Sequence, residues 1–193
     1  MNETLKLGLI LLLITAISAF VLAVSNNATS AKIEEADRIA NDEARKEVLP
    51  DVEKFEPLDE VKFKEINNSN EEVTEIYEGK DGSGEVKGYT LKTIIGGFGG
   101  DIEVITGISV EGQITGMKVL SHSETPGLGA NADQPEFQER FKGITTDNEL
   151  VIVKESPANE NEVQAITSAT ITSNAVADGV NLAREIYNSQ LSK

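Results

Sequence analysis

Residues 7–24 form an uncharged, strongly apolar stretch near the start of the chain, LGLILLLITAISAFVLAV. A helix of this length is about 27 Å long, close to the roughly 30 Å hydrocarbon core of a bilayer. A cleaved signal peptide is the alternative, because Ala23 and Ser25 resemble a small-x-small cleavage site. Signal peptides, however, have an apolar part of only about 7–15 residues. The stretch therefore predicts a retained transmembrane helix with the rest of the fold after it.

The charges beside this span predict its orientation. Lys6 precedes the span, and the next basic residue is Lys32, within an acid-rich region. The positive-inside rule then places residues 1–6 in the cytoplasm and the remainder of the chain outside it.

The composition excludes several classes of function. The chain has 33 acidic and 17 basic residues, a net charge of −16, which argues against a nucleic-acid partner. It has no cysteine and one histidine, His122, so we expect no metal site, and any iron–sulfur or haem centre must belong to a partner.

The pattern after the span predicts an α+β fold. Residues 25–50 predict a helical stalk that starts at Thr29 or Ser30 and ends before Pro50. Short apolar runs separated by turns then predict antiparallel strands, because no connection is long enough for a helix. Helical patterns return afterwards, the last with an apolar stripe. The predicted strands are 61–66, 73–77, 88–95, 102–110 and 114–120, and the predicted helices are 135–142 and 172–191.

Two glycine-rich loops are candidate ligand contacts. The run GGFGG at residues 96–100 lacks the spacing of a dinucleotide fingerprint, so it is either a tight turn or a close approach to a flat ligand. The loop SHSETPGLG at residues 121–129 contains Pro126-Gly127, which predicts a type II turn. Its Glu124 and Thr125 can hold polar edges of a small ligand, whereas His122 has no evident catalytic partner and is expected to be structural.

A hydroxyl-rich segment, AITSATITSN at residues 165–174, leads into the last predicted helix. Thr172 or Ser173 suits the N-cap, which puts Thr170 just before the helix. A helix N-terminus favours a phosphate group. The residues alone leave two interpretations open, a phosphate site beside a threonine hydroxyl or a plain capping loop.

Taken together and in order, these motifs resemble a known family. The apolar span, GGFGG, SHSETPGLGA, FKG at residues 141–143 and ITSATITSNAV resemble the G subunit of the Rnf electron-transport complex. The C subunit of the sodium-translocating NADH:quinone reductase is similar and shares the domain, so it is the alternative. A non-redox extracytoplasmic binding or structural module is the alternative from another class.

The resemblance implies a covalently bound FMN. In the family, a phosphodiester joins the flavin phosphate to the last threonine of a Ser/Thr-Gly-Ala-Thr motif. Thr167-Ser168-Ala169-Thr170 matches this motif, with Ser168 where the family usually has glycine, and Thr170 is the implied attachment site. Lys154 is a further candidate for stabilising a reduced flavin. The implied cofactor-binding residues are Glu124, Thr125, Gly127, Leu128, Gly129, Lys154, Thr167, Ser168, Ala169 and Thr172.

The resemblance also implies a function and partners. Residues 51–193 would be an FMN-binding domain of a membrane-anchored electron carrier. The implied complex couples electron transfer between reduced ferredoxin and NAD to sodium or proton transport. Its other membrane subunits and a flavin transferase are the expected partners.

Overall fold

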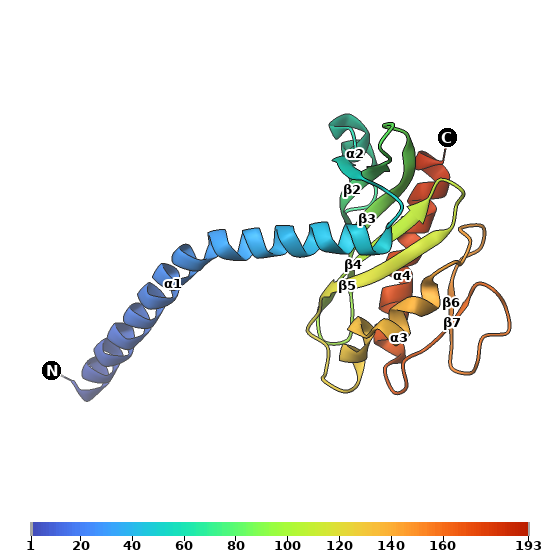
Figure 1. Cartoon of the computed structure of the whole chain (residues 1–193). Helices are drawn as coiled ribbons and strands as arrows, with labels where there is room; N and C mark the ends of the chain where they lie inside the picture. Colours follow the sequence, from blue (N-terminus) through green and yellow to red (C-terminus); the bar gives the residue numbers. More distant parts are fainter. Residues whose placement is uncertain (1, 193) are drawn as a thin grey trace. The chain divides into compact units, whose positions relative to one another are not determined.

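The computed structural model describes residues 2–192 and confirms the α+β fold (Figure 1). A five-stranded antiparallel sheet has the order β1-β2-β3-β4-β5, and β6 and β7 form a separate parallel pair. In chain order the elements are α1 (Glu3–Val48), β1 (Lys54–Pro57), α2 (Glu60–Asn67), β2 (Val73–Lys80), β3 (Val86–Gly96), β4 (Asp101–Ser109), β5 (Ile114–Ser121), the 3-10 helix η1 (Gly129–Asp133), α3 (Pro135–Gln138), the 3-10 helix η2 (Glu139–Phe141), β6 (Val151–Val153), β7 (Glu162–Gln164), α4 (Thr170–Ile186) and the π-helical turn η3 (Tyr187–Leu191).

The central strands β3, β4 and β5 were predicted to within two residues of their ends. Successive side chains of a strand point to opposite faces of a sheet. On β4, Ile102, Val104 and Ile108 belong to cores that include residues of α4, whereas Ile105 packs with residues at the end of α1. The sheet is therefore covered on both faces along its centre.

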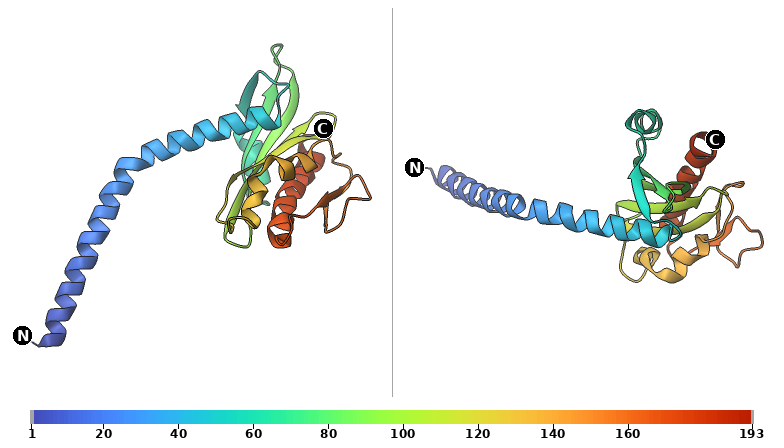
Figure 2. Two further views of the ribbon diagram at one scale, coloured as in Figure 1. Left: turned by 60° about the horizontal axis from the view of Figure 1, so that its bottom comes forward. Right: turned by 45° about the horizontal axis from the view of Figure 1, so that its top comes forward.

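Helix α4 lies across one face of the sheet in all the views (Figures 1 and 2). Gly179 lets the helix come close to β3, since a Cβ there would lie 2.8 Å from the Thr93 hydroxyl oxygen. The stripe of Val176, Val180 and Ala183 is fully buried against the strands. This packing fixes the N-terminal end of α4 next to the loops at one end of the central strands.

In the first half of the chain, two predictions about where elements form are wrong. Residues 61–66 form helix α2 rather than a strand, because the Asp59 carboxylate accepts hydrogen bonds from the Val61 and Lys62 amides and starts a helix. No helix begins at Thr29 or Ser30 either, since α1 runs through this segment and Thr29 Oγ1 donates to the Ser25 carbonyl inside the helix.

The contacts divide the chain into two compact units, the first ending at Asn41 and the second beginning at Asp42. The second unit thus includes the last residues of α1, which were predicted to belong to the stalk. Ala44 and Val48 are buried there and pack with Ile105. Thr115 Oγ1 also donates a hydrogen bond to the Val48 carbonyl.

Candidate functional site

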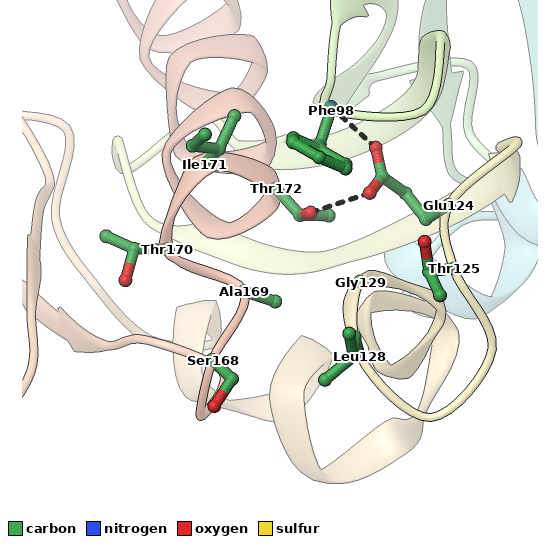
Figure 3. Close-up of a pocket in the computed structure, with 10 residues that line it drawn as sticks. All are labelled: Phe98, Glu124, Thr125, Leu128, Gly129, Ser168, Ala169, Thr170, Ile171 and Thr172. Atoms are coloured by element: carbon green, nitrogen blue, oxygen red, sulfur yellow. Dashed lines mark hydrogen bonds between the residues drawn. The ribbon is translucent and has the colours of Figure 1, made fainter.

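Three loops meet at the N-terminal end of α4 and enclose a cavity of about 370 Å³ (Figure 3). They are the β3–β4 turn that holds Phe98, the β5–η1 loop, and the segment that enters α4. The sequence places these loops far apart, and the packing of α4 on the sheet brings them together. The lining residues are Phe98, Glu124, Thr125, Leu128, Gly129, Ser168, Ala169, Thr170, Ile171 and Thr172.

Thr170 is the first residue of α4, not a residue upstream of it. The N-cap is Ala169, which has no side chain able to cap, so the predicted caps Thr172 and Ser173 are wrong. Ser173 Oγ instead donates to the Ala169 carbonyl and accepts from the Ile166 amide, both within 3.0 Å. The amides of Thr170, Ile171 and Thr172 have no partner within the helix and no side-chain cap, so this end offers N–H donors to an anion.

Glu124 links the three loops. Its Oε1 accepts hydrogen bonds from the Phe98 amide at 2.7 Å and the Gly99 amide at 3.0 Å, and its Oε2 accepts one from Thr172 Oγ1 at 2.8 Å (Figure 3). Burial by itself would raise the pKa of Glu124, but the hydrogen bonds from Gly99, Thr172 and Phe98 outweigh it and hold the pKa below its usual range. The carboxylate therefore stays ionised at neutral pH.

Large apolar side chains line the cavity and remain open to solvent. Phe98 is 69% exposed, Ile171 57% and Leu128 42%. Isolated exposed apolar residues are ordinary, but three around one cavity indicate a surface that a flat apolar group can cover. Phe98 and Ile171 were not predicted as site residues from the sequence. A phenylalanine between two glycine pairs was the available signal for the first.

The β5–η1 loop contains the predicted type II turn. The Leu128 amide donates to the Thr125 carbonyl at 3.1 Å, and Gly127 has a φ of +76°. His122 supports the same loop, since its Nδ1 accepts a hydrogen bond from the Glu124 amide at 3.2 Å. The turn presents Leu128 to the cavity.

Eight of the eleven predicted site residues line this cavity, and three do not. Thr167 and Gly127 line an adjoining cavity of about 600 Å³, which shares Leu128 and Ser168 with the first. Lys154 lies exposed in a bend after β6 and lines neither cavity.

The chain's fold and site define an FMN-binding domain. A family model of that description matches residues 97–185, from the β3–β4 turn almost to the end of α4. The matched segment contains all the loops that form the cavity.

Two relatives identify the family more closely. The G subunit of the Na⁺-translocating ferredoxin:NAD⁺ oxidoreductase complex of Acetobacterium woodii is 44% identical over 189 residues, covering 94% of this chain and 90% of that protein. The G subunit of an ion-translocating oxidoreductase complex of Methanosarcina acetivorans is 36% identical over 191 residues, covering 98% of this chain and 97% of that protein. The chain belongs to the family of Rnf complex G subunits.

A solved structure shows the same fold. The C subunit of the Na⁺-translocating NADH-quinone reductase of Parabacteroides distasonis matches with a TM-score of 0.55 at 19% identity, covering 81% of this chain and 96% of that one. This likeness confirms the arrangement of strands and helices.

The residues at the cavity fit FMN. The uncapped amides of α4 suit a phosphate, and the exposed faces of Phe98, Leu128 and Ile171 suit a flat aromatic ring. The volume lies within the range of small-molecule sites. Thr170 lies at the start of the helix, on the side of the cavity away from Glu124 (Figure 3).

Proposed function

We propose that this chain is the membrane-anchored, FMN-carrying electron-transfer subunit of an ion-translocating ferredoxin:NAD⁺ oxidoreductase complex. The cavity at the N-terminus of α4 carries the proposal, because it combines free helix amides, a threonine hydroxyl and an apolar rim. The relatives named above are G subunits of ion-translocating oxidoreductase complexes, and the one from Acetobacterium woodii belongs to a ferredoxin:NAD⁺ oxidoreductase complex. The other membrane subunits of the complex are the expected partners.

The chain's own residues hold and orient the cofactor in this proposal. The first-turn amides of α4 bind the phosphate, and the helix dipole favours its negative charge. Phe98 and Ile171 contact the ring and exclude water from it. When bound, FMN supplies one-electron and two-electron transfer, which no side chain of this protein supplies.

Thr170 is the proposed point of covalent attachment. This residue is half-buried at the helix start, next to the amides that would hold the phosphate. A phosphodiester there prevents dissociation of the cofactor outside the cytoplasm. A flavin transferase would supply the flavin phosphate within a pyrophosphate. The bond from Thr170 Oγ1 to phosphorus would form as the pyrophosphate P–O bond breaks, and the second phosphate would leave while the hydroxyl gives up its proton.

A pair of threonine variants tests this attachment. The full chain is co-expressed with a flavin transferase, denatured, and examined for flavin fluorescence in a gel. Wild type and Thr145→Ala should fluoresce, because Thr145 lines neither cavity and lies outside the matched motif. Thr170→Ala should be dark, yet it should unfold at nearly the wild-type temperature, since one hydroxyl contributes about 1 kcal/mol. A fluorescent Thr170→Ala protein, or a dark wild type, contradicts the proposal.

We also propose that the FMN-binding domain lies outside the cytoplasm. The apolar part of α1 is long enough to cross a membrane, and its large side chains are exposed in the structure. Lys6 precedes this part, and no further basic residue occurs before Lys32. The positive-inside rule then favours a cytoplasmic N-terminus.

A further inference from the structure

The carboxylate of Glu124 occupies a space that two glycines leave open. A Cβ on Gly97 would collide with Oε1, and a Cβ on Gly129 would collide with Oε2 and would lie 2.6 Å from Thr172 Oγ1. The residue is 6% exposed and still forms part of the cavity wall. The backbone is thus shaped to bring this particular carboxylate to the cavity.

This carboxylate has hydrogen-bond donors but no cationic partner. Its three donors are the Phe98 and Gly99 amides and the Thr172 hydroxyl, all neutral. Within residues 2–192, no lysine or arginine forms an ion pair with it, and His122 is the ionisable group that acts on it electrostatically. Neutral donors stabilise a charge without cancelling it, so a net negative charge remains at the cavity wall.

We propose that Glu124 is a positioning residue that also lowers the reduction potential of the flavin through its fixed negative charge. The inference rests on the proposed function, since it needs FMN in this cavity. Electrons that arrive on a flavin bring negative charge with them. A buried carboxylate at the cavity wall repels that charge, because few water molecules screen it.

The same three hydrogen bonds explain the positioning. Glu124 ties the turn that carries Phe98 to the first turn of α4, which carries Thr170 and Ile171. A neutral glutamine can replace these bonds, because its oxygen accepts from the two amides and its NH₂ group donates to the Thr172 hydroxyl oxygen. Glu124→Gln therefore removes the charge and keeps the connections.

The test compares two variants of the full chain whose expected effects have opposite signs. Each is loaded with FMN by co-expression with the transferase, and its flavin potential is measured by spectroscopic titration with dithionite. A variant that the transferase leaves unmodified is instead equilibrated with free FMN, and its affinities for the oxidised and reduced forms are compared.

Glu124→Gln should raise the potential, which is equivalent to a gain on the order of tenfold in relative affinity for the reduced form. Thr172→Val retains the charge of Glu124 and removes one of its hydrogen-bond donors. The negative charge of the carboxylate is then less well compensated, so the reduction potential of the flavin should fall. A general loosening of the site would shift the flavin potential of both variants in the same direction. If Glu124→Gln does not fold, the direction of the Thr172→Val shift decides the question.

Three results would overturn the inference while leaving the proposed function intact. They are an unchanged potential in Glu124→Gln, a potential in Thr172→Val that rises or stays the same, and loss of both flavin forms from a folded Glu124→Gln protein. Absence of flavin from the wild type is a different result, because it contradicts the proposed function itself.

Discussion

Ser168 adopts a left-handed backbone conformation, with a φ of +63°, two residues before Thr170. It is the one non-glycine residue with positive φ among residues 2–192. A side chain in this region is strained by roughly 1–2 kcal/mol, because its Cβ approaches the following carbonyl oxygen. This geometry gives a physical reason for preferring glycine at this position.

Replacing Ser168 by glycine should therefore stabilise the protein. The relieved strain exceeds the extra flexibility of glycine in the unfolded chain, leaving a net gain of up to about 1 kcal/mol. For a chain of this size we expect the melting temperature to rise by roughly 2–4 °C, measured by circular dichroism in detergent. Ser168→Ala is the control, because it removes the hydroxyl and keeps the strain. An equal gain in both variants, or a loss in Ser168→Gly, would show that the backbone is not strained.

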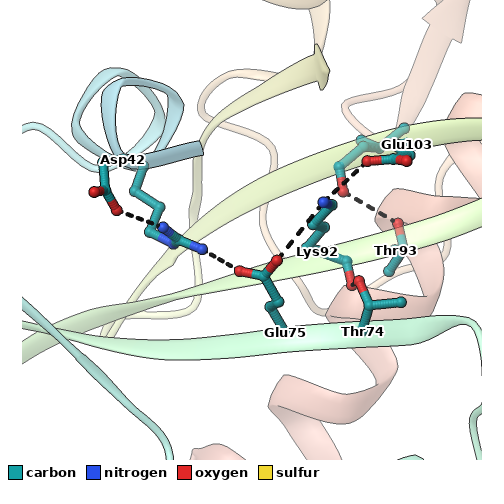
Figure 4. A network of polar contacts seen from close by, with 8 residues as sticks. Asp42, Thr74, Glu75, Lys92, Thr93 and Glu103 are labelled. Carbon is teal, nitrogen blue, oxygen red and sulfur yellow. Dashed lines mark hydrogen bonds and ion pairs between the residues drawn. The ribbon is translucent and has the colours of Figure 1, made fainter. Parts of the chain in front are cut away.

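At the scale of elements, the end of α1 is held to the sheet by a chain of charges (Figure 4). Arg45 forms ion pairs with Asp42 and with Glu75 of β2. Lys92 of β3 continues the chain, 3.6 Å from Glu75 and 2.9 Å from Glu103. The Arg45 side chain is 4% exposed, and its guanidinium carbon lies 3.8 Å from the centre of the Tyr77 ring.

We predict that Arg45→Ala destabilises the second compact unit. The substitution removes the contact of the buried guanidinium with the Tyr77 ring and two charge-assisted hydrogen bonds, which together should cost about 3 kcal/mol. The melting temperature should drop by roughly 6–12 °C. Arg38→Ala is the matched control on the same helix, since the pair of Arg38 with Glu35 is exposed to solvent and should contribute little to stability. Equal effects of the two substitutions would mean that Arg45 acts only as a surface charge.

The elements differ in how far the sequence alone could predict them. Strands β3 to β5 are rich in β-branched residues and are separated by short turns, so their sequence signal is local. Helix α2 was missed because its cap, Asp59, outweighs an apolar run that also suits a strand. The three-residue strands β6 and β7 pair only with each other, and nothing in their sequence specifies that pairing.

The features of the site also divide into those that the sequence could predict and those that it could not. The loop motifs identified Glu124, Leu128 and Thr170 before the structure placed them at one cavity. The hydrogen bonds of Glu124 could not be predicted, because its partners Phe98 and Thr172 lie 26 and 48 residues away. Sequence patterns find residue types, whereas the packing of α4 on the sheet decides which of them meet.

At the scale of the whole molecule, the chain combines an apolar α1 segment with a strongly acidic remainder. The large side chains of residues 7–24 are exposed in the structure, which suits contact with lipid. The net charge of −16 favours solvation over adsorption to an anionic membrane surface. We therefore expect α1 alone to hold the chain at the membrane.

The proposed orientation can be tested directly because the protein has no cysteine of its own. A cysteine at Ser192 should react with a membrane-impermeant thiol reagent in intact cells. A cysteine at Asn2 is the control and should react only after lysis, since it precedes the span. The reverse pattern would place the FMN-binding domain in the cytoplasm and remove the reason given for covalent attachment.

The central claim is that FMN is bound covalently at Thr170, and peptide mapping tests it most directly. Trypsin should release residues 155–184 as one peptide, because no lysine or arginine lies between Lys154 and Arg184. In protein co-expressed with the transferase, mass spectrometry should find FMN, less one water, on this peptide, with fragment ions placing it on Thr170. An unmodified peptide, or an adduct on Thr167, Ser168 or Thr172, would contradict the account.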